Sequence, residues 1–223
     1  MKLGSLPDGG PHGRLVVVSR DLTVCSDARH IAPSLAAALA DWDSAAPELD
    51  LIARGVEALA QPLERFHERV ACAPLPVAGS DRYDGPRSPI RAGDETVSAS
   101  IGFAIVGGRL FALAVGLGSA GATLSPVAVS EDDVGHGTLC VRVAGRAPAR
   151  IDACLLLPHL PDAPAGPPAP GVARLAPVAV LTLHPGDTIR VEYRDRAGHS
   201  VFGAIERTVT AEAVAEAEAL AEG

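Results

Sequence analysis

The stretch "SASIGFAIVGGRLFALAVG", Ser98 to Gly116, decides the fold. Two apolar runs with strand character stand on either side of a Gly-Gly pair, which is a pattern typical of a β-hairpin. At the mouth of the first strand lie Ser98, Ser100 and Gly102, a place where strands often deliver a carboxylate or a metal ligand to a cleft. The hairpin therefore predicts a β-rich region and raises the question of what its first strand holds.

The chain after this hairpin continues in strands and turns. The clearest further signal is "DTIRVEYRDRAGHSVFGAIERTV" (187–209), which reads as two alternating strands around a turn at Asp195 to His199. Single strands are expected at 124–129, 138–143 and 178–183. A Pro-rich loop is expected at 158–171, and the acidic tail 211–223 is expected to fray because no lysine offsets its glutamates.

The chain before the hairpin mixes a strand with helices. A short buried strand is predicted within Gly13 to Leu22, and the segment 31–60 has helical spacing, with Pro47 predicted to break it into two helices. A third short helix is predicted at 62–70. The sequence thus indicates an α+β fold with a small mixed N-terminal domain (1–78), a larger β-rich domain (79–210) and a C-terminal tail (211–223).

Composition restricts the environment and the partners. The chain has 223 residues, 48% hydrophobic and 21% charged, and a net charge of −8. This balance predicts a packed core and argues against nucleic acid or an anionic membrane as a partner, since both require concentrated positive charge. No apolar run is long enough for a bilayer, the N-terminus lacks a signal-peptide pattern, and the four cysteines form no CxxC pair. A cytoplasmic protein is expected.

One absence is informative. Lys2 is the only lysine, and the chain has no asparagine. The sequence therefore predicts no Walker-type phosphate site, no Schiff-base chemistry in the interior and no lysine general base. Arginine cannot replace lysine as a base because it stays protonated.

Three motifs have an ordinary structural explanation. "GLGSAG" (116–121) fits GxGxxG, but the segment after it has strand character, so a turn is favoured over a dinucleotide site. Ser119 lacks the nucleophile-elbow spacing, because Leu117 stands where the first glycine is required. "EDDVGH" (131–136) is expected to be a solvated loop, and the histidines are isolated in the sequence. The residues taken alone assemble no catalytic constellation.

Both ends of the chain nevertheless resemble one family. "MKLGSLPDGGPHGRLVVVSRDL" (1–22) and "CAPLPVA" (72–78) resemble the N-terminal domain of bacterial fumarylacetoacetate hydrolase-like proteins. "GSDRYDGPRSPI" (79–90), "LSPVAVSEDDVG" (124–135) and "PGDTIRVEYRDRAGHSVFGAIERTV" (185–209) are similar to successive segments of that family's catalytic domain. The resemblance implies a rolled, mixed β-sheet, a dimer, a bound Mg²⁺ or Ca²⁺, and cleavage of C–C bonds in acylpyruvates and β-diketo acids.

The same resemblance implies that the family's metal-binding and catalytic groups are missing from this chain. Aligned through "FAIV", the family's metal-binding Glu-x-Glu pair falls on Ser100 and Gly102, and its catalytic lysine falls near Ser119. The segment with the catalytic histidine has no counterpart, the metal-binding aspartate is lost, and the substrate loop is reduced to "GVARLAP" (171–177). Hydroxyl and hydrogen cannot replace two carboxylates around a hard dication. The ancestral Mg²⁺ or Ca²⁺ site is therefore expected to be lost, with no cofactor and no catalytic residue retained.

We expect a catalytically degenerate member of the family, a pseudoenzyme acting as a binding or scaffolding subunit. Its expected partners are a second copy of the chain or an intact paralogue. Two alternatives stay open, so whether the chain is an enzyme is undecided. One is an enzyme with a repurposed pocket and new chemistry in a biosynthetic pathway. The other is a retained metal-dependent hydrolase of acylpyruvate or β-diketo acid substrates with relocated ligands, for example Asp94 and Glu95.

Overall fold

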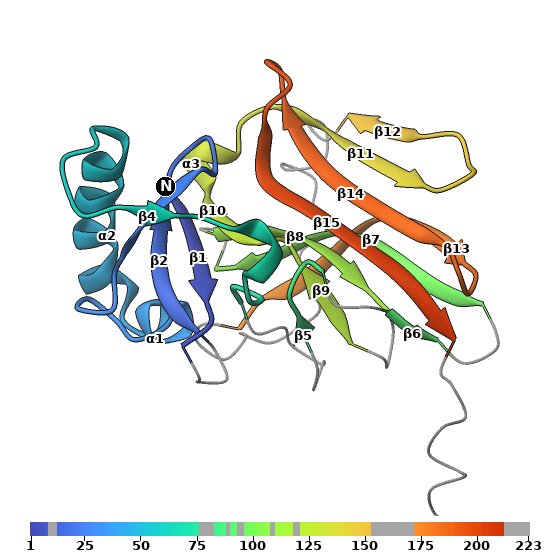
Figure 1. Cartoon of the computed structure of the whole chain (residues 1–223), viewed down its shortest axis with the longest axis horizontal. Coiled ribbons are helices and arrows are strands. Elements are labelled where there is room, and N and C mark those ends of the chain that lie inside the picture. Colours follow the sequence, from blue (N-terminus) through green and yellow to red (C-terminus); the bar gives the residue numbers. More distant parts are fainter. Residues whose placement is uncertain are drawn as a thin grey trace, which may run out of the picture.

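The computed structural model describes residues 1–8, 13–75, 83–87, 90–92, 96–107, 110–117, 121–152 and 172–211. Within them the chain is mostly β, with few helices, and its strands form two sheets (Figure 1). The larger sheet has the order β13-β7-β8-β10-β1-β2-β3-β4, with β9 pairing to β8 and β5 to β9, and the smaller has the order β12-β11-β14-β15-β6. The strands of the larger sheet are β1 (Lys2–Leu6), β2 (Arg14–Val18), β3 (Val24–Asp27), β4 (Glu64–Arg65), β5 (Tyr83–Asp84), β7 (Val97–Val106), β8 (Leu110–Gly116), β9 (Ala122–Leu124), β10 (Val127–Ser130) and β13 (Arg174–Leu183). Those of the smaller sheet are β6 (Ile90–Ala92), β11 (Gly137–Val143), β12 (Ala149–Asp152), β14 (Thr188–Asp195) and β15 (Ser200–Ala211).

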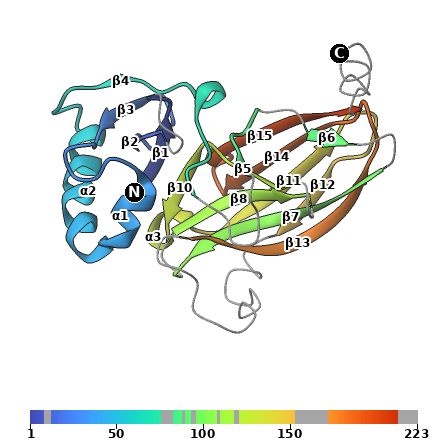
Figure 2. The same ribbon diagram turned by 90° about the horizontal axis from the view of Figure 1, so that it is seen from below.

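Both predicted hairpins are confirmed. Strands β7 and β8 pair antiparallel, and Gly107 at the turn has a positive φ of 56° that glycine adopts without strain. Strands β14 and β15 pair in the same way around the turn after Asp195. Alternation of side chains places one face of each hairpin in a shared core, so the two sheets pack face to face (Figure 2).

An aromatic cluster occupies the centre of this core. The ring of Phe103 in β7 lies 5.9 Å from Tyr193 in β14, and Phe202 in β15 lies 5.6 Å from Tyr193, both edge-to-face. Arg207, also in β15, is only 2% exposed, and its Nη1 donates a hydrogen bond to the Thr123 hydroxyl in β9. This bond and the rings fix the two sheets against each other.

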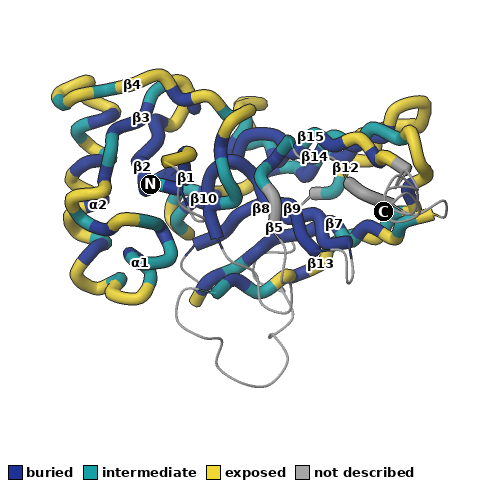
Figure 3. Tube along the Cα trace, turned by 60° about the horizontal axis from the view of Figure 1, so that its bottom comes forward, coloured by how far each residue is buried: buried dark blue, intermediate teal, exposed yellow. Residues whose placement is uncertain are grey.

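The other face of the larger sheet carries the helices. Helix α1 (Leu35–Ala40) begins at Ser34, whose hydroxyl accepts a hydrogen bond from the Ala37 amide, and α2 (Trp42–Glu57) follows. Their buried side chains pack against Leu3, Leu15 and Val17 of the sheet, and the residues facing away are exposed (Figure 3). Since β1 pairs with β10, the sheet runs without interruption from the N-terminal strands into the later ones.

Two predictions about the helices are wrong. Pro47 does not break the segment: it lies inside α2, and the break is at Asp41, whose φ of −133° and ψ of 57° are not helical. The helix tolerates the lost amide because Ala45, Leu49, Ile52 and Val56, at helical spacing, all pack into the core.

The third predicted helix is replaced by shorter elements. Glu64 and Arg65 form β4, which pairs with β3, and only residues Glu68–Val70 form a single 3₁₀ turn, η1. Conversely, the expected loop at 131–136 contains a short helix, α3 (Glu131–Val134). In both places pairing or packing with a distant strand decides a conformation that local propensity leaves open.

Some expectations fall outside the described residues: the Pro-rich loop at 158–171, the centre of "GLGSAG" and the tail from 212 onward. In the part that is described, no helix combines the length and the apolar character that crossing a membrane requires.

Candidate functional site

The mouth of β7 is the position at which the sequence predicts a lost metal site. Ser100 is half-buried and Gly102 is buried, and both side-chain positions lie on the sheet face opposite the aromatic cluster. In the register of the sheet, Ser100 lies between Gly116 of β8 and Val180 of β13, and Gly102 lies between Ala114 and Pro177. The site is thus bounded on both sides by paired strands.

Gly102 is required here because the backbone of β13 comes very close. A Cβ built on Gly102 would overlap the carbonyl oxygen of Ala176, which belongs to β13. The register of β13 shifts between Pro177 and Ala179, so the strand bulges at this point. Proline is compatible with this position because β13 is the edge strand of the sheet. The structure leaves no room for any side chain at position 102.

The donor atoms at this strand mouth do not fit a hard dication. Ser100 offers a single hydroxyl and Gly102 offers no side chain, whereas Mg²⁺ and Ca²⁺ require several oxygens, some of them anionic. Among the residues that the structure describes, no three His, Cys, Asp or Glu side chains are grouped so as to hold a metal ion. Ser119 and the alternative ligands Asp94 and Glu95 lie outside the described residues.

The histidines and cysteines form no second candidate in the described chain. The described histidines are all exposed: His30, His67, His136, His184 and His199. Cys25, Cys72 and Cys140 are free thiols, and burial raises the pKa of Cys25 to about 12. A thiol with so high a pKa is not a nucleophile at neutral pH.

The exclusion of interior Schiff-base chemistry rests on the premise that the interior holds no lysine, and that premise is wrong. Lys2 is only 6% exposed, and its Nζ donates hydrogen bonds to the carbonyl oxygens of Arg20 (2.8 Å) and Ser200 (3.4 Å). Strand β1 lies between β2 and β10 in the middle of the sheet, and the turn between β14 and β15 brings the Ser200 carbonyl to the lysine. A lysine next to the N-terminus is usually exposed, so only these distant neighbours reveal its burial.

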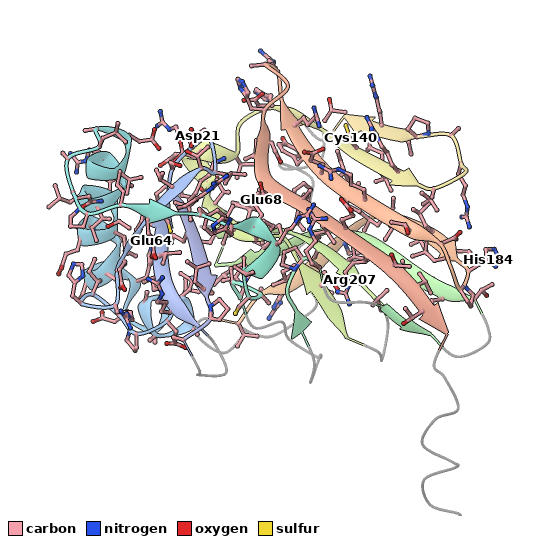
Figure 4. All side chains as sticks on the ribbon, viewed as in Figure 1. Asp21, Glu64, Glu68, Cys140, His184 and Arg207 are labelled. Atoms are coloured by element: carbon pink, nitrogen blue, oxygen red, sulfur yellow. The ribbon has the colours of Figure 1, made fainter. Side chains whose placement is uncertain are left out.

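Lys2 lines a cleft of about 630 Å³ at the junction of the N-terminal strands and the smaller sheet. Asp21, at the turn between β2 and β3, and Glu68 of η1 contribute to its walls, and Figure 4 shows both near this junction. Arg20, Leu22, Asp133, Val134, Gly135, Asp195, His199, Ser200 and Val201 complete the lining. Four carboxylates therefore face one buried amine and one exposed guanidinium.

Hydrogen bonds and charges organise the rim of this cleft. The Met1 amine donates to the carboxylate of Asp133 and to Ser130 Oγ, and the Arg20 guanidinium lies 3.6 Å from Asp133. Burial lowers the pKa of Lys2 to about 8, although the negative charges of Asp133, Asp195 and other acids oppose that shift. Near pH 8 a substantial fraction of Lys2 is thus the neutral amine, which is the nucleophilic form.

Comparison with known proteins adds a family match and a fold. Residues 1–77 match the family model described as fumarylacetoacetase N-terminal domain 2. No curated protein matches the chain. Among solved structures, maleylpyruvate hydrolase from Sphingobium sp. SYK-6 is 14% identical with a TM-score of 0.65, covering 95% of this chain and 100% of that chain.

Two further structures are similar over the same length. The same hydrolase in complex with manganese(II) and pyruvate has a TM-score of 0.66 at 14% identity, with 95% and 99% of the two chains covered. The 5-carboxymethyl-2-hydroxymuconate delta-isomerase from Mycobacterium smegmatis has a TM-score of 0.58 at 16% identity, with 95% and 100% covered. At these identities the likeness establishes a shared fold.

Proposed function

The chain belongs to the fumarylacetoacetate hydrolase family, and from that premise we propose that it is a catalytically degenerate member acting as a binding or scaffolding subunit. The family's rolled sheet, a division near residue 78 and a cytoplasmic location are parts of the same proposal. The observation that carries it is the contact between Gly102 and the Ala176 carbonyl.

This close approach indicates that the fold excludes a metal-binding side chain at position 102, and not only that the ligand has been replaced. If position 102 were merely variable, a carboxylate there could be regained by one substitution. Instead the backbone of β13 occupies the space that the first atom of a side chain would need. With a hydroxyl at Ser100 as the remaining group of the pair, neither of these two positions supplies the charge that would compensate the dehydration of Mg²⁺ or Ca²⁺. Without the metal, the oxo group of an acylpyruvate is not polarised there.

Metal titration tests the proposal directly. Calorimetry with Mg²⁺, Mn²⁺ and Ca²⁺ should show no one-to-one site of micromolar affinity, because Ser100 and Gly102 supply no charge. A one-to-one site that is lost in Asp94→Asn or Glu95→Gln would instead support the hydrolase with relocated ligands. Glu131→Gln, at an exposed acid in α3, is the matched control for a non-specific loss of negative charge.

Self-association, or pairing with an intact paralogue, is the second part of the proposal. Its support is the edge of the larger sheet, where β13 is the last of the described strands and exposes Leu175 (37%) and Val180 (63%). An edge strand with exposed apolar side chains readily pairs with another chain.

Val180→Glu should therefore shift the protein toward the monomer, by about tenfold or more in the dissociation constant, since a charge would be buried at the interface. Light scattering over a concentration series measures the shift. Leu51→Glu is the matched control, because Leu51 is similarly exposed (66%) but lies on α2, away from the edge. A strictly monomeric wild-type chain, alone and with any homologue encoded beside it, would contradict this part.

One observation favours the alternative of a repurposed enzyme. The buried amine of Lys2 faces a cleft that uses none of the residues at the mouth of β7.

A further inference from the structure

Lys2 is the only lysine of the chain, and the fold gives its amine and the Met1 amine different surroundings. The Met1 amine is held by the carboxylate of Asp133. Lys2, in contrast, donates to two neutral carbonyl oxygens, and it has no carboxylate ion pair within the described residues. Burying an ammonium that donates only to neutral carbonyl oxygens is costly, and this cost outweighs the attraction of the carboxylates around the cleft, so Lys2 loses its proton more easily than an exposed lysine.

A second observation indicates a ligand. The hydroxyl oxygen of Ser200 is buried and has no hydrogen-bond partner in the structure, and Ser200 lines the same cleft as Lys2. Buried polar atoms are nearly always hydrogen-bonded, so an unsatisfied hydroxyl beside a cleft points to a polar group that binds there. The cleft volume of about 630 Å³ lies in the usual range for small-molecule sites.

We propose that this cleft binds a small, uncharged hydroxyaldehyde and that Lys2 forms an imine with its carbonyl carbon. The cleft carries the carboxylates of Asp21, Glu68, Asp133 and Asp195 against the positive charges of Lys2 and Arg20. This negative balance disfavours anionic oxo acids, and the Ser200 hydroxyl can bond a hydroxyl of the ligand. The proposal uses other residues than the proposed function, so either can fail without the other.

The step balances without a co-reactant. The lone pair of neutral Nζ attacks the carbonyl carbon and a C–N bond forms, while the carbonyl oxygen takes up a proton and the nitrogen loses one. The resulting hydroxyl is protonated and leaves as water, which breaks the C–O bond and gives the protonated imine. Glu68 and Asp195 line the cleft and can accept and return these protons.

Reductive trapping tests the proposal on the intact protein. Glycolaldehyde with sodium cyanoborohydride should convert Lys2 to a secondary amine, which peptide mass spectrometry locates. The rate should rise with pH around a midpoint near 8, where Lys2 loses its proton. Glyoxylate, an anionic aldehyde of similar size, should react about tenfold more slowly, because the acidic cleft repels it. The Met1 amine is an internal reference in every sample.

Two variants distinguish binding of the aldehyde in the cleft from simple accessibility of the Lys2 amine to the reagent. Ser200→Ala should slow the trapping of Lys2 by glycolaldehyde several-fold and leave labelling of the Met1 amine unchanged. Lys2→Arg keeps the charge and should abolish the adduct at position 2. If Lys2 is labelled only after unfolding in guanidinium, its role is limited to the hydrogen bonds that it donates within the fold, and the proposal is overturned. Equal rates for glycolaldehyde and glyoxylate in the wild-type protein would overturn the ligand class, and that measurement needs no variant.

Discussion

Gly102→Glu is expected to lower the free energy of unfolding by about 3 kcal/mol or more, which is at the upper end for overpacking of a core. The first side-chain atom at this position would overlap the carbonyl oxygen of Ala176, and a backbone carbonyl in a paired strand cannot move aside as a side chain can. Gly102→Ala should already show most of the loss, because the overlap is with Cβ itself. Chemical denaturation followed by circular dichroism measures both.

Ser100→Glu is the matched control for this prediction. It introduces the same carboxylate two residues away on the same face of β7, at a half-buried position that already has a Cβ. Its cost should stay within about 1 kcal/mol, as for most substitutions outside the core. If Gly102→Glu is as stable as the wild type, the backbone of β13 does not exclude a side chain at position 102. The family's paired carboxylates could then be restored at this strand mouth.

Cleavage of acylpyruvates or fumarylacetoacetate should be at background with Mg²⁺, Mn²⁺ or Ca²⁺. A general base and a metal electrophile each contribute several orders of magnitude, so the rate should lie about 10⁴-fold or more below that of a family member with an intact site. Ser100→Glu combined with Gly102→Glu should not restore turnover, since position 102 has no room for the side chain. Loss of the β-diketone absorbance is the measurement.

A chelator and one variant distinguish the possible contrary results. Hydrolysis by the unmodified protein that EDTA abolishes would make the family's ordinary activity the better answer. Turnover that survives EDTA but disappears in Lys2→Arg would place new chemistry in the Lys2 cleft. Background rates in all samples are the expected result for the degenerate member.

The sequence by itself predicted the two hairpins and the resemblance to the family. Apolar runs on both sides of the Gly-Gly pair predict the hairpin of β7 and β8, because short apolar segments that flank a turn signal are typical of paired strands. The resemblance also predicts that Ser100 and Gly102 stand where the family has its paired carboxylates. The prediction of a helix break at Pro47 failed because packing of α2 on the sheet outweighs one lost hydrogen bond.

Only the tertiary structure decided why Gly102 must be glycine and where Lys2 lies. The carbonyl that fills the space at Gly102 comes from Ala176, far along the chain, and reaches β7 through a bulge in an edge strand. Lys2 is buried because β1 lies between β2 and β10 and the β14–β15 turn supplies the Ser200 carbonyl. Burial, close backbone approach and a lowered pKa all depend on which distant segments meet. Hydrophobic periodicity records only which face of each segment is buried.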